Sequence, residues 1–221
     1  MEHFFEVLLT CPLFAGIRRE ELTSMLDCLG GKTVEISKGA PVFLEGDPAQ
    51  FVGVVLSGAI QILRDDYYGN RSVMTAVEPG ELFGEAFSCA GIKTLPVSAI
   101  ALKNSTVLLI DCKHVLTVCP KACQFHNQLV NNLLRVMARK NLALSQKIQV
   151  MSHKTTKEKL MAYLLDQAKR KQSPEFVIPY DRQALADYLG VERSAMSAEI
   201  SKLKKAGIID SKGSWFRIQR P

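Results

Sequence analysis

The segment from Tyr180 to Ile209, YDRQALADYLGVERSAMSAEISKLKKAGII, has the pattern of two short helices around a tight turn. Asp181 is placed to cap the first helix, and Gly190 interrupts the pattern after it. A second helix is predicted over 193–206, with Gly207 ending it in a left-handed conformation. The apolar positions expected to face inward are Ala184, Leu185, Leu189, Met196, Ile200 and Leu203. This arrangement is typical of a helix-turn-helix motif.

The residues after this segment predict a β-hairpin over Asp210–Ile218, turning at Ser211–Ser214. A hairpin directly behind a helix-turn-helix would form a wing. The combination predicts a winged helix-turn-helix that reads double-stranded DNA. The local pattern leaves one alternative open, an ordinary helical hairpin within a core.

The distribution of charge supports the DNA-binding interpretation. Residues 152–221 contain 14 Lys and Arg against 8 Asp and Glu, whereas residues 1–151 contain 14 of each. The net charge of +6 therefore lies wholly in the third of the chain that carries the predicted motif, as neutralisation of phosphates requires. A basic face can also be a solvated surface, so the charge supports the motif without proving it.

The remaining composition predicts a cytoplasmic, well-packed protein. The 221 residues are 47% hydrophobic, which suits real cores, and no apolar run approaches the ~20 residues of a membrane span. The first residues, MEHFFEVLLT, lack the basic start and cleavage site of a signal peptide. We expect free thiols rather than disulfides at the six cysteines, which are Cys11, Cys28, Cys89, Cys112, Cys119 and Cys123.

The region from Gly31 to Asp111 alternates short β-branched or aromatic runs with turn signals. The predicted strands are 33–36, 42–44, 51–56, 59–64, 72–77, 97–102 and 106–110. Short strands at this spacing predict an antiparallel double-sheet barrel or jelly roll, preceded by short helices over 1–30. The region contains no histidine, which argues against an enzyme of the metal-oxygenase type on such a roll.

One long helix is predicted over 122–151, where neither Gly nor Pro occurs. Its apolar residues recur at three- and four-residue steps: Leu129, Leu133, Val136, Met137, Ala143, Leu144, Ile148 and Met151. A roll alone is too small to bury this stripe, so a second copy of the helix is the expected cover, with a single long core helix as the alternative. The predicted α+β chain thus divides into a sensing roll with N-terminal helices (1–121), a dimerisation helix (122–151) and a DNA-binding domain (152–221) that begins with a hinge at 152–156.

This order of parts resembles the Crp/Fnr family of bacterial transcription regulators, the cyclic-AMP receptor and fumarate–nitrate reductase regulators. The motifs that carry the resemblance are Lys38-Gly39, Glu45-Gly46-Asp47, Leu56-Ser57-Gly58, Gly69-Asn70-Arg71, the run 79–85 (PGELFGE) and the run 189–194 (LGVERS). The resemblance implies an effector-binding roll, a homodimer, a near-palindromic DNA operator and RNA polymerase as a further partner. It implies a regulator and not an enzyme.

The resemblance also implies where an effector would bind. Members that bind cyclic nucleotides follow their Gly-Glu motif with an Arg-Ser pair, whose arginine neutralises the cyclic phosphate. Here Gly84-Glu85 is present, but the pair is replaced by Leu95 and Pro96, and Lys93 would need a shifted loop to substitute. We therefore expect an unknown small effector of mainly apolar or weakly polar character and not a cyclic nucleotide, with Glu85 kept for structure. The expected lining is Phe83, Gly84, Glu85, Ala86, Phe87, Val97, Ser98, Leu144 and Ser145.

The base-facing positions of the family's recognition helix match Arg193, Ser194, Ser197 and Ala198, and the turn adds Glu192. Arg193 retains a guanidinium that fits guanine O6 and N7. Ser194 and Ala198 replace a common Glu and a common Arg, so we expect a half-site different from those of the two namesake regulators. Arg182 and Gln183 are expected on phosphates, with Lys202, Lys204 or Lys205 adding charge.

Two alternatives to an organic effector remain at this stage. The N-terminal cysteine cluster of iron–sulfur members is not reproduced, and Cys119, Cys123 and His126 are a weak metal-site candidate at helical spacing. Structural thiols are the expectation for the cysteines, and a regulator that senses redox state or a metal is the alternative. Haem ligation by a histidine has no specific support, so no metal is expected. The loss of the Arg-Ser pair also permits a constitutive DNA binder with a vestigial sensor.

Overall fold

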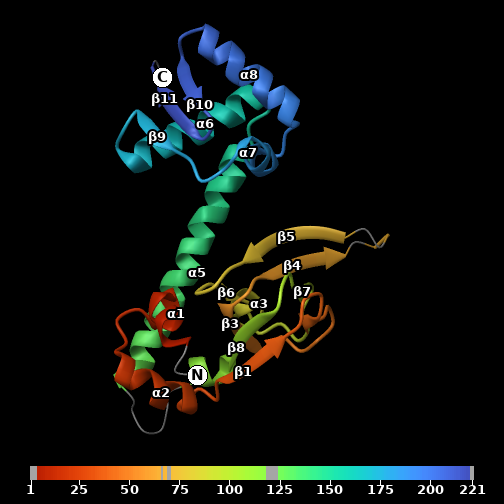
Figure 1. The fold of residues 1–221 in the computed structure, drawn as a ribbon, viewed down its shortest axis with the longest axis vertical. Helices are drawn as coiled ribbons and strands as arrows, with labels where there is room; N and C mark the ends of the chain where they lie inside the picture. The colour runs from red at the N-terminus through yellow and green to blue at the C-terminus, as the bar shows by residue number, and fades with distance from the viewer. Residues whose placement is uncertain (1–3, 66, 69–70, 118–123, 220–221) are drawn as a thin grey trace. The chain divides into compact units, whose positions relative to one another are not determined.

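The computed structural model describes residues 4–65, 67–68, 71–117 and 124–219, which form two compact units, Met1–Ala138 and Arg139–Pro221 (Figure 1). Among these residues no helix combines the length and apolar character that crossing a membrane would require. The predicted turn at Gly69-Asn70 and the candidate ligands Cys119 and Cys123 lie outside the described residues. Each unit has its own core and is described by itself.

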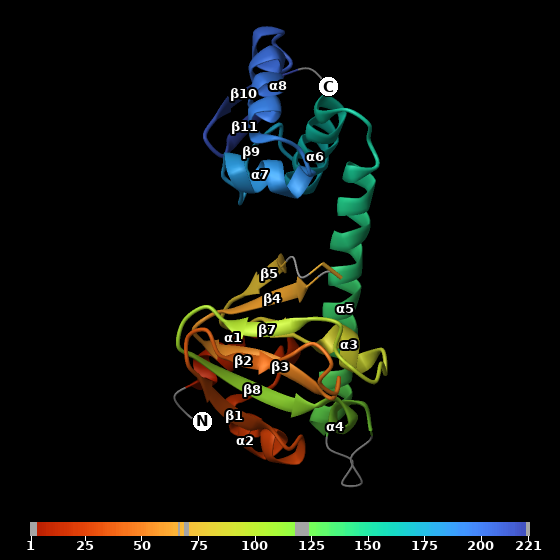
Figure 2. The ribbon, with the colours of Figure 1, turned by 90° about the vertical axis from the view of Figure 1, so that its right-hand side faces the viewer.

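The first unit contains the predicted β-roll. Its strands are β1 (Lys32–Ile36), β2 (Pro41–Phe43), β3 (Phe51–Ser57), β4 (Ile60–Asp65), β5 (Arg71–Val77), β6 (Leu82–Phe83), β7 (Ser98–Ala101) and β8 (Ser105–Asp111). They form two antiparallel four-stranded sheets in the orders β1-β8-β3-β6 and β2-β7-β4-β5. Figure 2 labels these strands except β6, which is labelled in Figure 1. The α+β double-sheet roll expected from the sequence is confirmed.

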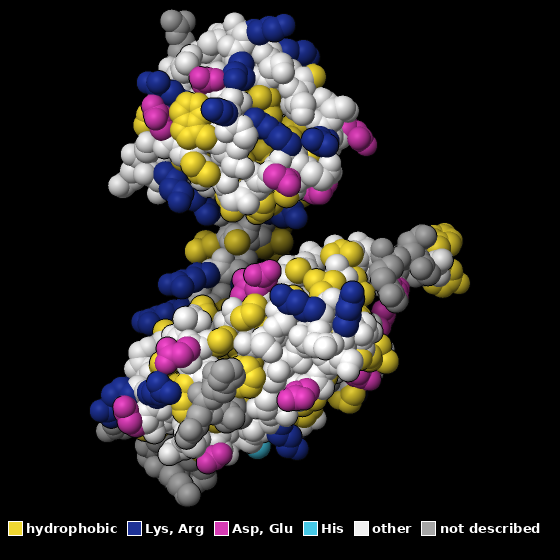
Figure 3. All heavy atoms as spheres, in the orientation of Figure 1, with side chains coloured by type: hydrophobic (Ala, Val, Ile, Leu, Met, Phe, Trp, Pro, Cys, Tyr) yellow, Lys and Arg dark blue, Asp and Glu magenta, His cyan; other side chains and the backbone are white. Residues whose placement is uncertain are grey.

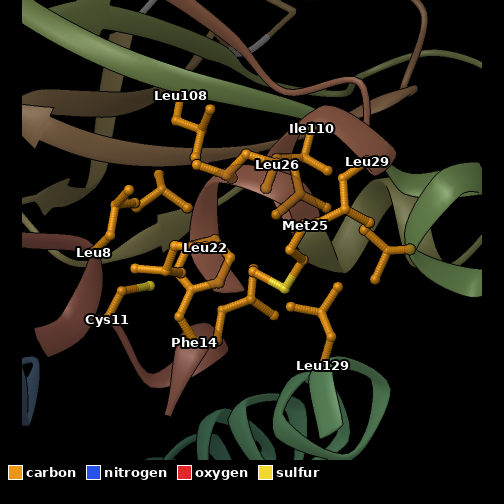
Figure 4. Packing of buried hydrophobic residues seen from close by; sticks show 14 of the residues in the cluster. Leu8, Cys11, Phe14, Leu22, Met25, Leu26, Leu29, Leu108, Ile110 and Leu129 are labelled. Carbon is orange, nitrogen blue, oxygen red and sulfur yellow. The ribbon is translucent and has the colours of Figure 1, made fainter. Parts of the chain in front are cut away.

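Side chains of β3 and β8 alternate between two hydrophobic clusters, as the two-residue period of a strand requires. Val54 and Leu108 face the helices α1 (Phe5–Thr10), η2 (Pro12–Phe14), α2 (Arg19–Cys28) and α4 (Cys112–Leu116), whereas Val55 and Val107 face the second sheet. Figure 4 shows the helix-side cluster, in which Leu8, Phe14 and Leu22 meet Leu108, Ile110 and Leu129. The central strands are therefore buried on both faces.

The sequence did not predict β6 or the helix behind it, α3 (Glu85–Cys89). The strand is only two residues long, and Gly84 joins it to α3 with a φ of 78°. A side chain there would be strained, and a Cβ would lie 3.0 Å from the Phe51 carbonyl oxygen. Gly84 therefore fixes the approach of α3 to β3.

In the second unit, the described residues that follow the long helix form three helices and three strands. It comprises α6 (Thr156–Lys171), β9 (Glu175–Val177), α7 (Arg182–Leu189), α8 (Arg193–Lys205), β10 (Ile209–Lys212) and β11 (Trp215–Ile218), with sheet order β10-β11-β9. The wing is confirmed, but Lys212 pairs with Trp215, so the turn contains only Gly213 and Ser214 and is tighter than predicted. β9 was not predicted.

The long helix α5 (Gln124–Met151) runs through the end of the first unit and the start of the second. Its first turns do not need a partner copy to bury their apolar face, because Leu129 and Leu133 pack into the helix-side cluster of the roll. Asn132 Nδ2 also donates to the carbonyl oxygens of Leu13 and Ala15, at 3.0 and 2.8 Å. The expectation that the whole stripe requires a partner was therefore wrong for this end of the helix.

Candidate nucleic-acid interface and effector pocket

The turn between α7 and α8 is built by local chemistry that the sequence predicted. Asp181 Oδ1 accepts a hydrogen bond of 2.8 Å from the Ala184 amide and caps α7. Gly190 closes α7 with a φ of 60°, in the left-handed region that favours glycine. Met196, Ile200 and Leu203 of α8 are buried against α6 and α7, as predicted. The inward face of α8 is thereby fixed, and its outward face is presented to solvent.

The outward face of α8 carries all four of the predicted base-facing residues. Arg193, Ser194, Ser197 and Ala198 are each exposed, and their spacing places them within one side of the first turns of the helix. Glu192 is exposed at the N-cap and makes no side-chain cap bond. This face holds a single guanidinium among small side chains, so it could pack closely into a groove of DNA. Figure 3 shows Lys and Arg side chains spread over the surface of the same unit.

Arg182 has a structural environment that the sequence did not indicate. Its guanidinium carbon lies 4.8 Å from the centre of the Phe216 ring, and its Nη2 donates to Ser211 Oγ at 3.2 Å. Partial burial lowers the pKa of Arg182 from its ordinary value. Arg182 therefore connects α7 to both strands of the wing. Gln183, by contrast, is exposed and donates to Asp187 Oδ1 at 2.9 Å.

A second contact fixes the wing to the recognition helix. Lys204 Nζ lies 3.0 Å from Asp210 Oδ1 and donates to the Ser211 carbonyl oxygen at 2.7 Å. The hydrogen bond from Lys204 lowers the pKa of Asp210. Lys202 pairs with Glu199 one turn earlier in the same helix, at 2.6 Å. Of the three lysines expected to add charge, Lys204 thus also positions the wing.

The predicted effector-pocket residues of the β6–α3 segment differ in exposure. Phe83 and Glu85 are buried, at 4% and 3% exposed, whereas Gly84 and Phe87 are partly exposed and Ala86 is exposed. Phe83 belongs to the inter-sheet core, where its ring covers Gly53 so closely that a Cβ there would lie 2.3 Å from it.

Phe43, which was not predicted from the sequence as part of the pocket, adjoins Phe83, and Phe51 in turn stacks on Phe43. The Phe43 ring lies 5.9 Å from the Phe83 ring and 6.5 Å from the Phe51 ring, with the latter pair stacked. Aromatic residues in neighbouring strands were the available signal, but strand periodicity alone does not show which of them meet. The three rings give this part of the roll an apolar character.

The position of the family's phosphate clamp is also apolar in this chain. Leu95 is 5% exposed, and its backbone pairs with the Gly46 turn, its carbonyl accepting from the Gly46 amide at 2.9 Å. Pro96 next to it is exposed and has no amide hydrogen to donate. The side chains at these two positions offer neither positive charge nor a hydrogen-bond donor to a phosphodiester.

The remaining predicted pocket residues are distributed between the two units. Val97 is buried, and Ser98 Oγ accepts a hydrogen bond of 3.0 Å from the Glu45 amide, which fixes the entry into β7. Leu144 and Ser145 are exposed residues of α5 in the second unit. Their contribution to the pocket stays a prediction.

Of the three residues of the weak metal-site candidate, the structure describes only His126, and the contacts of His126 do not support a metal site. His126 is 8% exposed, and its Nε2 lies 2.9 Å from the Val115 carbonyl oxygen, within hydrogen-bond distance. Within the described ranges, no group of three or more His, Cys, Asp or Glu residues is arranged to hold a metal ion. His126 instead connects α5 to α4.

Comparison with known proteins assigns both units. The model of the cyclic nucleotide-binding domain matches residues 33–121, and that of the Crp-like helix-turn-helix domain matches residues 158–221. The chain belongs to the Crp/Fnr family of transcription regulators. Family membership makes it a DNA-binding regulator with a cyclic-nucleotide-binding-type sensor domain, and not an enzyme.

Two relatives and one solved structure illustrate the similarity. The transcriptional activator protein Anr of Pseudomonas aeruginosa is 26% identical over 188 residues, covering 83% of this chain and 75% of that protein. The cyclic AMP receptor protein of Thermus thermophilus is 24% identical over 198 residues, covering 90% and 88%. The c-di-GMP responsive regulator CLP of Xanthomonas campestris shares the fold, with a TM-score of 0.57 at 16% identity, covering 91% of this chain and all of that one.

Proposed function

We propose that this Crp/Fnr member is a homodimer that binds a near-palindromic operator through the exposed face of α8. The observation that carries the proposal is the outward presentation of Arg193, Ser194, Ser197 and Ala198 from a helix whose opposite face is buried. Arg193 would read guanine, and the small neighbours would allow close approach to the groove. Gln183 and Arg182 would contact phosphates from α7, with Arg182 retaining its contact to the wing.

The homodimer is supported by the apolar residues of α5 that the protomer leaves exposed. Leu134, Leu144, Ile148 and Met151 are 62%, 58%, 60% and 43% exposed. Together with Met137 and Asn141 they recur at alternating steps of three and four residues, which is the spacing of the a and d positions in the seam of a two-stranded coiled coil. Asn141 would be the single polar residue in this seam, a position that commonly sets the register of a pair.

The effector is proposed to be a small molecule of mainly apolar character, bound at the β6–α3 segment of the roll. The buried Leu95 at the clamp position and the aromatic group of Phe43, Phe51 and Phe83 support this assignment over a cyclic nucleotide. Binding would act by shifting the population of DNA-competent dimers. A constitutive regulator with a vestigial sensor is the second candidate, favoured by the same loss of the clamp.

The proposal is tested by selecting DNA from a randomised pool with the full-length protein as purified. We expect an enriched near-palindrome whose half-sites lie about one helical turn, 10–10.5 base pairs, apart. Native mass spectrometry of the same preparation would report the dimer and any bound small molecule. Enrichment of a single half-site by a monomer would contradict the dimeric model. Tight operator binding by protein that carries no ligand would favour the constitutive alternative.

A further inference from the structure

Two cysteines far apart in the sequence lie side by side in the first unit. Cys89 is the last residue of α3 and Cys112 is the first residue of α4, and their Sγ atoms are 3.4 Å apart. A disulfide has an S–S bond of about 2.05 Å, so bond formation needs the sulfurs to approach by only about 1.4 Å. Neither sulfur takes part in the DNA-binding face or in the predicted lining of the effector pocket.

The two thiols have different surroundings. Cys112 is 3% exposed and lies in the helix-side core, whereas Cys89 is partly exposed at the edge of the same core. Two carboxylates act electrostatically on the pair: Glu85, on the first turn of α3, raises the pKa of Cys89, and Asp111, which caps α4, acts to raise that of Cys112. Ser88 also faces the pair, with its hydroxyl donating to the Gly84 carbonyl oxygen at 3.0 Å.

The hydrogen bond within the pair shifts the pKa values of the two thiols in opposite directions. A hydrogen bond from the Cys89 thiol lowers the pKa of Cys112 to about 7, with Ser88 helping and burial and Asp111 opposing. The same hydrogen bond, together with burial and the negative charge of Glu85, raises the pKa of Cys89. The lowered pKa favours the thiolate at Cys112 rather than at Cys89, and the thiolate is the reactive form of a cysteine.

We propose that Cys89 and Cys112 form a redox-responsive site that hydrogen peroxide converts into an intrachain disulfide. The oxidant must be small and uncharged, because Cys112 is buried. This modification site is additional to effector binding and does not depend on the proposed DNA contacts.

The reaction balances with one molecule of peroxide. The Cys112 thiolate attacks one peroxide oxygen, the O–O bond breaks, and the departing hydroxide takes a proton to leave as water. The Cys89 sulfur then attacks the Cys112 sulfenic acid, forming the S–S bond and breaking the S–O bond. The Cys89 proton leaves with the second hydroxide as water. Both sulfurs are oxidised by one electron each, and the peroxide is reduced to two molecules of water.

The disulfide would join two segments that adjoin other parts of the sensor. α3 follows the Gly84 turn of the proposed effector segment, and α4 is connected to α5 through the Val115 carbonyl oxygen and His126 Nε2, 2.9 Å apart. Oxidation would therefore fasten α3 to α4 and restrict their relative movement.

The test treats the reduced, full-length protein with hydrogen peroxide, blocks remaining thiols and digests it with trypsin without reduction. Cys89 lies in the tryptic peptide 72–93 and Cys112 in the peptide 104–113, and each peptide contains one cysteine. We expect the two peptides to be linked, with a mass two hydrogens below their sum, and to separate on reduction. Cys28→Ser, which changes an exposed cysteine outside the pair, is the matched control and should leave the linked species unchanged.

Cys89→Ser should abolish the linked species and leave Cys112 as a sulfenic or higher acid, and Cys112→Ala should abolish both. Both variants are compared with wild type by circular dichroism, so loss of folding is separated from loss of the thiol. The proposal is overturned if peroxide oxidises folded wild-type protein without linking peptides 72–93 and 104–113. The proposal is also overturned if either peptide is linked to peptides that contain other cysteines as often as the two are linked to each other. Because the readout is covalent, neither result depends on whether the protein binds an operator.

Discussion

The Arg182 guanidinium lies 4.8 Å from the centre of the Phe216 ring, so the first helix of the helix-turn-helix rests on the second strand of the wing. The same side chain donates to Ser211 on the first strand of the wing. A residue expected to contact only phosphate therefore also holds the DNA-binding unit together. Loss of the Arg182 side chain would therefore have two effects: it would remove an expected phosphate contact, and it would remove contacts between α7 and the wing.

Arg182→Ala should lower the free energy of unfolding by about 1–2 kcal/mol, because it removes a cation–π contact and a side-chain hydrogen bond. Chemical denaturation monitored at Trp215 in the wing measures this loss. Gln183→Ala is the matched control, since Gln183 is exposed and bonded only within its own helix. Equal stability of the two variants would show that Arg182 has no structural role.

Replacing Leu144 and Ile148 together with Glu should raise the dimer dissociation constant by about a hundredfold or more, because two charges would be placed in an apolar seam. Sedimentation equilibrium measures the change. Leu142→Glu is the control, because Leu142 is as exposed, at 64%, but lies off the heptad positions. If Leu142→Glu dissociated the dimer and the double variant did not, the seam would be assigned to the wrong face of α5.

The reactivity of Cys112 should depend on pH with a midpoint of about 7, because hydrogen bonding from Cys89 favours its thiolate. Below this pH Cys112 is protonated and peroxide oxidation slows, whereas above it the rate reaches a plateau. Cys89→Ala removes the donor and should move the midpoint upward, toward the ordinary thiol value of about 8.5. The ultraviolet absorbance of the thiolate, as the difference from Cys112→Ala, measures both midpoints. A midpoint unaffected by Cys89→Ala would contradict the assignment of Cys89 as the donor.

Tyr163→Phe should leave the second unit equally stable or more stable by about 1 kcal/mol. The Tyr163 hydroxyl is buried beside the rings of Tyr180 and Tyr188 and has no hydrogen-bond partner among the described residues. Burial accordingly raises the pKa of Tyr163. Thermal unfolding compares the variant with wild type, and Leu164→Ala in the same core is the destabilising reference. A loss of more than about 1 kcal/mol in Tyr163→Phe would reveal a partner for the hydroxyl.

The sequence predicted those parts of the fold that local chemistry determines. Asp181 and Gly190 mark the ends of α7, and the helical period correctly placed Met196, Ile200 and Leu203 in the core. The strands of the roll other than β6 also followed from their β-branched or aromatic runs and from the turn signals between them. These features depend on residues only a few positions apart. The family resemblance then related the order of the predicted elements to a complete fold.

The features that were missed depend on contacts between distant segments. β6 is too short to show a period, and the cover of Leu129 by the roll requires the N-terminal helices to be in place. Cys89 and Cys112 are separated by 23 positions, so their approach is visible only when α3 and α4 are packed. The same limit applied to the effector pocket, where the sequence could exclude a phosphate clamp but could not arrange the aromatic rings.

The most direct test of DNA reading by α8 compares Arg193→Ala with wild type on the selected operator and on its single-base-pair variants. We expect Arg193→Ala to lose about 1–3 kcal/mol of operator-binding free energy and to relax the preference at one guanine-containing base pair in each half-site. Lys169→Ala, which removes an exposed cation of α6, is the charge-matched control and should keep the preference at every position. Unchanged affinity and unchanged preference in Arg193→Ala would contradict the proposed docking of α8 in the major groove.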